Sequence, residues 1–157
     1  MRKCLVVANL TAESPALRAE ASAIVRQDPD AEFVVLVPIR TIPPSLALGG
    51  GLDGRALRSR RAARARARLE SVGARQVSVR LGRAEPLAEI ERVLREGGFT
   101  TVVISTLPRH LSHWLHRDLP GRVARAHPEL EVRHVIAPRL LYVDDLSLAT
   151  SAGAERA

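Results

Sequence analysis

Short continuous apolar runs that alternate with helix-like segments constrain the fold of this chain most strongly. The first two runs, Cys4–Ala8 and Phe33–Val37, contain no alternating polar residues, which is typical of strands covered on both faces in a parallel sheet. Further strands are expected at Gln76–Leu81, Phe99–Ser105 and Val132–Ala137. We therefore predict an α/β fold: a doubly wound, Rossmann-like sheet of five parallel strands with helices on both faces.

Helices are predicted between the strands from their caps and their apolar stripes. Ser14 is a suitable N-cap for a helix that has Pro15 at its first position. Pro86 begins another helix, which the pair Gly97-Gly98 ends. A third helix contains an arginine-rich segment and is expected to end at Gly73. Its inward stripe is predicted to consist of Ala62, Ala65, Leu69 and Val72.

The chain is expected to form a single domain at residues 1–138, followed by a tail at residues 139–157. The tail carries one apolar cluster, Leu140–Val143, and then Ser/Ala/Gly-rich sequence, so we expect it to be partly disordered. The stretch Pro38–Gly54 is rich in proline and glycine and is long for a connection in a compact domain. It is interpreted as a mobile lid or a disordered loop.

The positive charge is concentrated in one segment. The 157 residues include 24 lysines and arginines and 17 acidic residues, and seven of the arginines lie in Arg55–Arg68 without an acid among them. Nucleic-acid binding by this segment is one interpretation. The arginines occupy more than one helix face, however, and aromatic residues for base stacking are missing nearby. We therefore favour a solvated helix surface with Arg61, Arg64 and Arg68 directed outward.

Composition and motifs exclude several classes of protein. The single cysteine, Cys4, cannot build a disulfide scaffold or a thiol-paired zinc site. The N-terminal apolar run is short for a secretory signal, and no stretch approaches the roughly 18–20 apolar residues that span a bilayer. We therefore expect a cytoplasmic protein without a membrane partner.

Catalytic motifs are missing from the sequence. It contains no G-x-S-x-G elbow, no G-x-G-x-x-G after a strand and no Walker lysine. His110, His113 and His116 would fan over about 120° of a helix, so all three could hardly close on one metal ion. We expect a surface histidine cluster, no metal site, no catalytic residues and no enzyme activity.

A small ligand is expected where the order of the strands reverses, beyond their carboxyl ends. The turns after the first and fourth apolar runs, Asn9–Thr11 and Ser105–Arg109, are the candidates. At these turns the chain resembles the universal stress protein family. Lys3–Thr11 (KCLVVANLT) is similar to the family's first strand, K-I-L-V-x-x-D-x-S, with Asn9 in place of the aspartate and Thr11 in place of the serine.

Two later segments extend the resemblance, which covers about Arg2 to Ala137. LGRAEP, which ends at Pro86, resembles the glycine-plus-proline turn that follows the family's third strand. The segment Val102–Ala126 resembles the nucleotide motif G-x2-G-x9-G-S/T and the helix after it. The resemblance implies a five-stranded α/β fold, a role in the stress response, ATP binding and a dimer.

The nucleotide motif is altered in this chain. Ser105 and Pro108 replace its first two glycines, and Arg117-Asp118 replaces its glycine-serine pair. As N-cap, Asp118 is expected to accept from the backbone N–H groups that would bind a phosphate, and Pro120 removes another donor. We therefore expect the standard ATP site to be lost, and no firm cofactor. ATP binding in a modified mode is the alternative, with the candidate pocket Asn9, Thr11, Val37, Ser105, Thr106, Arg109, Ser112 and Arg117.

Association is the remaining expectation for function. An edge strand at Val132–Ala137 would present unpaired backbone groups, and Leu140–Val143 could cover the same surface. We therefore expect a homodimer through the fifth strand, in a universal stress protein-like protein that acts by binding other proteins. The sequence does not identify a protein partner.

Overall fold

The computed structural model describes residues 1–8, 11–38, 54–82, 85–108 and 117–137, and it describes side chains in the second helix from residue 59 onward. Residues 39–53 of the predicted loop Pro38–Gly54, the predicted tail at residues 139–157 and the histidine cluster lie outside the described residues, and Gly54 is the first residue of the second helix. In chain order the elements are β1 (Lys3–Val7), α1 (Pro15–Gln27), β2 (Glu32–Val37), α2 (Gly54–Ser71), β3 (Gln76–Leu81), α3 (Pro86–Leu94), β4 (Thr101–Thr106), α5 (Leu119–Ala126) and β5 (Glu131–Ile136).

The sheet confirms the predicted fold class. Its five strands are all parallel and lie in the order β3-β2-β1-β4-β5. Strand order therefore reverses between β1 and β4, where Leu5 of β1 is in register with Val34 of β2 and Val102 of β4. The fourth strand begins at Thr101, two residues later than predicted, and Phe99 packs into the core before the strand begins.

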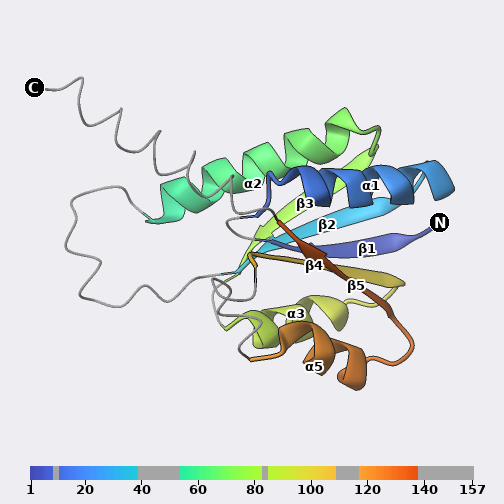
Figure 1. Cartoon of the computed structure of the whole chain (residues 1–157), viewed down its shortest axis with the longest axis vertical. Helices are drawn as coiled ribbons and strands as arrows, with labels where there is room; N and C mark the ends of the chain where they lie inside the picture. The colour runs from blue at the N-terminus through green and yellow to red at the C-terminus, as the bar shows by residue number, and fades with distance from the viewer. Residues whose placement is uncertain (9–10, 39–53, 83–84, 109–116, 138–157) are drawn as a thin grey trace, which may run out of the picture.

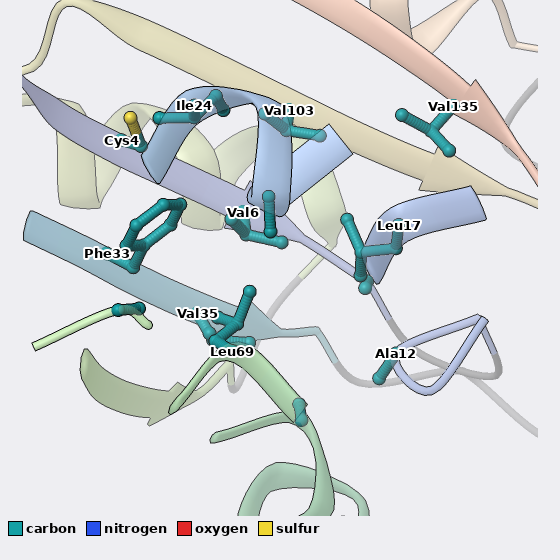
Figure 2. Packing of buried hydrophobic residues seen from close by; sticks show 14 of the residues in the cluster. Cys4, Val6, Ala12, Leu17, Ile24, Phe33, Val35, Leu69, Val103 and Val135 are labelled. Atoms are coloured by element: carbon teal, nitrogen blue, oxygen red, sulfur yellow. The ribbon is translucent and has the colours of Figure 1, made fainter. Parts of the chain in front are cut away.

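Helices cover both faces of the sheet, with α1 and α2 on one face and α3 and α5 on the other (Figure 1). Alternate residues of β1 supply the two cores, since side chains of a strand alternate between faces. Cys4 and Val6 pack under α1 and α2, as Figure 2 shows, whereas Leu5 and Val7 pack against the α3 and α5 side. This double burial explains why the central strands are continuous apolar runs.

Local signals place the helix ends as predicted. The Ser14 hydroxyl accepts a hydrogen bond of 3.1 Å from the Leu17 amide, and Pro15 is the first residue of α1. Gly73, Gly97 and Gly98 all have positive φ angles after their helices, a conformation that glycine adopts without steric cost.

The packing of α2 agrees with its predicted stripe, with one difference. Ala62, Ala65 and Leu69 are buried, and Val72 is half-buried. Arg64 and Arg68 are exposed as expected. Arg61 was predicted to point outward but is half-buried, because at about 100° per residue it lies only about 40° from Ala65.

The Cys4 thiol is fully buried in the α1–α2 core, and burial raises its pKa, which keeps it protonated and unreactive. Within the described part of the chain, no helix is long and apolar enough to cross a membrane.

Candidate ligand site at the ends of β1 and β4

Thr11 and Ser105 meet where the strand order reverses. The Thr11 hydroxyl donates a buried hydrogen bond of 3.0 Å to the Ser105 carbonyl oxygen, which joins the turn after β1 to the end of β4. Ser105 is 1% exposed, and its own hydroxyl has no hydrogen-bond partner among the described residues. An unpaired buried hydroxyl is costly, so the Ser105 hydroxyl is the polar group at the predicted ligand position that most clearly indicates a binding partner.

Thr106 belongs to the opposite face of β4. Its hydroxyl lies 2.7 Å from Nε2 of His134 in β5, and its carbonyl oxygen accepts a hydrogen bond of 2.8 Å from the Ala137 amide. Desolvation lowers the pKa of His134, which favours the neutral ring. Both groups of Thr106 therefore fasten β4 to the edge strand, and its hydroxyl is already paired.

Val37 ends β2 as a core residue. Its side chain is fully buried in the α1–α2 cluster, and its carbonyl oxygen accepts a hydrogen bond of 2.8 Å from the Gly82 amide. Val37 therefore packs against other apolar groups and holds the ends of β2 and β3 together.

Glu89 is a buried polar residue at this end of the sheet that the sequence analysis did not identify. It is 4% exposed, in the first turn of α3, and Arg92 Nη2 lies 2.8 Å from its Oε2. A Cβ added at Gly82 would lie 3.1 Å from Cγ of Glu89 and 3.0 Å from Cα of Pro38. Gly82 therefore lets Glu89 approach the ends of β2 and β3. Glu89 could have been noticed in the sequence because it lies beside the apolar stripe of α3 and four residues after Glu85.

Arg117 and Asp118 lie at the N-terminus of α5. The Arg117 side chain is 60% exposed, and its Nη1 lies 4.0 Å from Oε1 of Glu85. Asp118 is the N-cap as predicted, but its carboxylate makes no capping hydrogen bond, so that part of the prediction was wrong. The residue has a left-handed backbone, with φ 49° and ψ 48°, whereas a capping side chain needs an extended backbone at this position.

The Asp118 carboxylate lies instead over the first turn of the helix. Its oxygens are so close to Gly121 that a Cβ there would overlap them, and Oδ2 lies 3.2 Å from Nη2 of Arg125. The first turn also lacks the N–H of Pro120, its second residue, and the Arg122 amide donates to the Asp118 carbonyl oxygen at 2.9 Å. The helix N-terminus therefore carries a carboxylate, which is paired with Arg125, and few available donors.

Three predicted site residues, Asn9, Arg109 and Ser112, lie outside the described residues. Of the other five, the structure brings Thr11 and Ser105 together, places Val37 and Thr106 in buried packing and pairing roles, and leaves Arg117 exposed. No group of three histidine, cysteine or acidic side chains that could hold a metal ion occurs in the part of the chain that the structure describes.

Solved structures with the same fold are universal stress proteins. One, in complex with cAMP, is 16% identical, with a TM-score of 0.59 over 87% of this chain and 98% of that one. A protein from Archaeoglobus fulgidus in complex with dAMP is 14% identical, with a TM-score of 0.56 over 86% and 97% of the two chains. Another structure from Archaeoglobus fulgidus is 13% identical, with a TM-score of 0.59 over 86% and 93%.

No family model matches the sequence, and no curated protein matches it either. At these identities the likeness shows the fold, and the predicted resemblance is confirmed at that level: the chain has the fold of universal stress proteins.

Proposed function

We propose that this chain is a universal stress protein-like protein that acts in the stress response by association and lacks the standard ATP site of that family. The observation that carries the proposal is the position of the Asp118 carboxylate over the first turn of α5. A helix N-terminus binds a phosphate through its exposed N–H groups and the positive end of its dipole. In this chain the Asp118 carboxylate lies beside that end of α5.

Placing a phosphate there has an electrostatic cost. A carboxylate about 4 Å from a phosphate charge is repelled by roughly 1 kcal/mol in water and roughly 4 kcal/mol at an effective dielectric constant of 20, and the exposure of Asp118 places the cost toward the lower value. The ion pair with Arg125 offsets part of this, but both side chains are more than 60% exposed, where such pairs are worth about 1 kcal/mol or less. Because Pro120 has no N–H and the Arg122 amide is already bonded, Leu119 and Gly121 are the remaining donors of the first turn.

The edge strand β5 supports association. β5 pairs with β4 on one side, and no strand of the described residues pairs with its other side. Ile136 is 52% exposed on this strand, a large apolar residue at the surface. Arg133, which could protect the edge by its charge, is instead held in ion pairs with Glu20 and Glu131. These features fit a dimer in which two β5 strands meet.

Sedimentation equilibrium at about 100 μM tests this dimer. The wild-type chain is expected to be dimeric, and Ile136→Lys is expected to be monomeric, because the lysine places a charge in the apolar contact. Ser78→Lys, an exposed position on the opposite edge strand β3, is the matched control and should remain dimeric. A monomeric wild-type chain at this concentration would contradict self-association.

A second candidate function is nucleotide binding in a modified mode. It is favoured by the unpaired Ser105 hydroxyl, and proteins of the same fold have been solved with cAMP and dAMP. In this case ATP at micromolar concentration would raise the melting temperature, and Ser105→Ala would lose the effect. Arg109→Ala is the corresponding variant for a phosphate contact.

A further inference from the structure

The two helical layers of this protein differ in charge. Helices α1 and α2 together contain nine arginines and two glutamates, a formal charge of +7, which equals the formal net charge of the whole chain. Helices α3 and α5, on the other face of the sheet, contain three arginines and two glutamates, a charge of +1. The fold therefore places the positive charge on one face of the molecule, where it produces a directed electrostatic field.

Within this layer, three arginines form a line along α2. Arg60, Arg64 and Arg68 follow one another at intervals of four residues, all three are exposed, and the repeat corresponds to about 6 Å along the helix axis. The sequence alone favoured a solvated surface, because the seven arginines are distributed around the helix. In the described part of α2 four arginines are exposed, and one of them, Arg66, is ion-paired with Glu70 at 2.8 Å. The other three lie on one side of the helix, within about 80° of arc.

Intramolecular acids neutralise little of this line. Among the described residues, the guanidinium groups of Arg60 and Arg68 make no ion pair, and Arg64 makes one of 3.4 Å with Glu13, with the Arg64 side chain 59% exposed. That ion pair links α2 to the turn before α1, and the two helices lie side by side in Figure 1. α1 adds the exposed Arg18 to the same layer.

The chemistry of the surface indicates a phosphate backbone. Guanidinium groups bind phosphates through two parallel hydrogen bonds, and regular spacing of such groups suits a polymer of phosphates. Single-stranded nucleic acid needs aromatic side chains on which bases stack, and the described part of α1 and α2 contains none. Insertion into a membrane needs an apolar helix face, but Ala62, Ala65 and Leu69 are buried against the sheet.

We propose that the α1–α2 face, centred on Arg60, Arg64 and Arg68, binds the phosphate backbone of duplex DNA without sequence preference. This surface lies on the layer opposite α5, and the proposal does not depend on the state of the ATP site or on the dimer. Binding of this kind depends on the release of counterions from DNA, so its affinity falls steeply with salt.

Fluorescence anisotropy with a labelled 20-base-pair duplex of mixed sequence, between 50 and 200 mM KCl, tests the proposal. The wild-type chain should bind with a slope of log K against log salt of about −3 or steeper, since each neutralised phosphate contributes about −0.9. The variant Arg60→Gln/Arg64→Gln/Arg68→Gln should bind at least about tenfold more weakly at 50 mM KCl, with a slope shallower by about 3. A second duplex of different sequence should bind equally.

The matched control is Arg95→Gln/Arg122→Gln/Arg125→Gln, which removes the same charge from exposed positions on the α3–α5 side. It should retain most of the affinity, and circular dichroism melting confirms that both variants fold. The proposal would be overturned by a wild-type chain that does not bind the duplex at 50 mM KCl, or by equal losses in the two variants. Tighter binding to single-stranded DNA or to phosphatidylserine vesicles than to the duplex would also overturn it.

Discussion

The carboxylate of Asp118 lies over Gly121 so closely that a side-chain carbon at residue 121 would overlap both of its oxygens. The glycine therefore makes room for an acid at the N-terminus of α5, the position where the sequence resemblance places the glycine-serine pair of the universal stress protein motif. The positive φ of Asp118 directs the side chain over the helix turn and away from a capping position. The acid and the glycine form one local unit.

This unit predicts coupled effects of two substitutions. Gly→Ala inside a helix usually stabilises by about 0.5–1 kcal/mol. Gly121→Ala should give no such gain in the wild-type chain, because the new Cβ displaces the Asp118 carboxylate from Arg125. In an Asp118→Gly background the same substitution should stabilise by the usual amount. Urea unfolding of the four proteins measures the difference, and equal effects in both backgrounds would contradict the contact.

Thr11 and Ser105 provide a second prediction. Thr11→Val removes the donor to the Ser105 carbonyl oxygen, which is buried, and should lower the free energy of unfolding by about 1–2 kcal/mol. Ser105→Ala removes a hydroxyl that has no partner among the described residues and should leave the stability unchanged or raise it by up to about 1 kcal/mol. Chemical denaturation at pH 7 compares the two variants. A loss of more than about 1 kcal/mol in Ser105→Ala would show that this hydroxyl is hydrogen-bonded.

His127 predicts a pH dependence of stability. Burial lowers its pKa, but hydrogen bonds at 3.0 Å to Glu91 and 3.1 Å to Glu129 outweigh this, so the pKa is raised above its ordinary value. A raised pKa means that the stabilisation is complete below about pH 6.5, the unfolded value, and is lost as the pH rises through the folded value. His127→Gln should therefore cost about 0.5–1 kcal/mol more at pH 5.5 than at pH 8.

His134 predicts the opposite pH dependence of stability, because its pKa is shifted in the opposite direction. Its pKa is lowered by desolvation, so its contribution is present above the unfolded value and is lost as the pH falls through the folded value. His134→Gln should therefore cost more at pH 8 than at pH 5.5. Free energies of unfolding of the two variants at both pH values are the measurement, and the same pH trend for both would contradict these assignments.

The sequence predicted the fold because its main signals are local. Apolar runs such as Phe33–Val37, the cap at Ser14 and the positive-φ glycine at Gly73 each depend on neighbouring residues. The site depends on contacts that a pattern does not contain. The bond from Thr11 to Ser105 joins residues 94 positions apart, and the buried Glu89 lies so close to Gly82 that a Cβ there would come within 3.1 Å of its Cγ.

Asp118 illustrates both what the sequence predicts and what it does not. Its place at the start of a helix followed from Pro120 and from the resemblance of this segment to the family's nucleotide motif, and the structure agrees. The left-handed backbone, with which the carboxylate lies over Gly121 without a capping hydrogen bond, is a conformation that few non-glycine residues adopt and that no local signal indicated. The acid was predicted to occupy the donors of a phosphate and also to repel its charge. The structure shows no capping hydrogen bond from the carboxylate, so the proposed loss of ATP binding rests on the charge alone.

Isothermal titration of ATP into the wild-type chain and into Arg117→Gly/Asp118→Ser tests the central claim most directly. The double variant restores the glycine-serine pair of the family motif and removes the carboxylate from the start of α5. We expect no binding to the wild-type chain at ATP concentrations up to about 1 mM and measurable binding to the variant. ATP binding to the wild-type chain with a micromolar Kd would contradict the account.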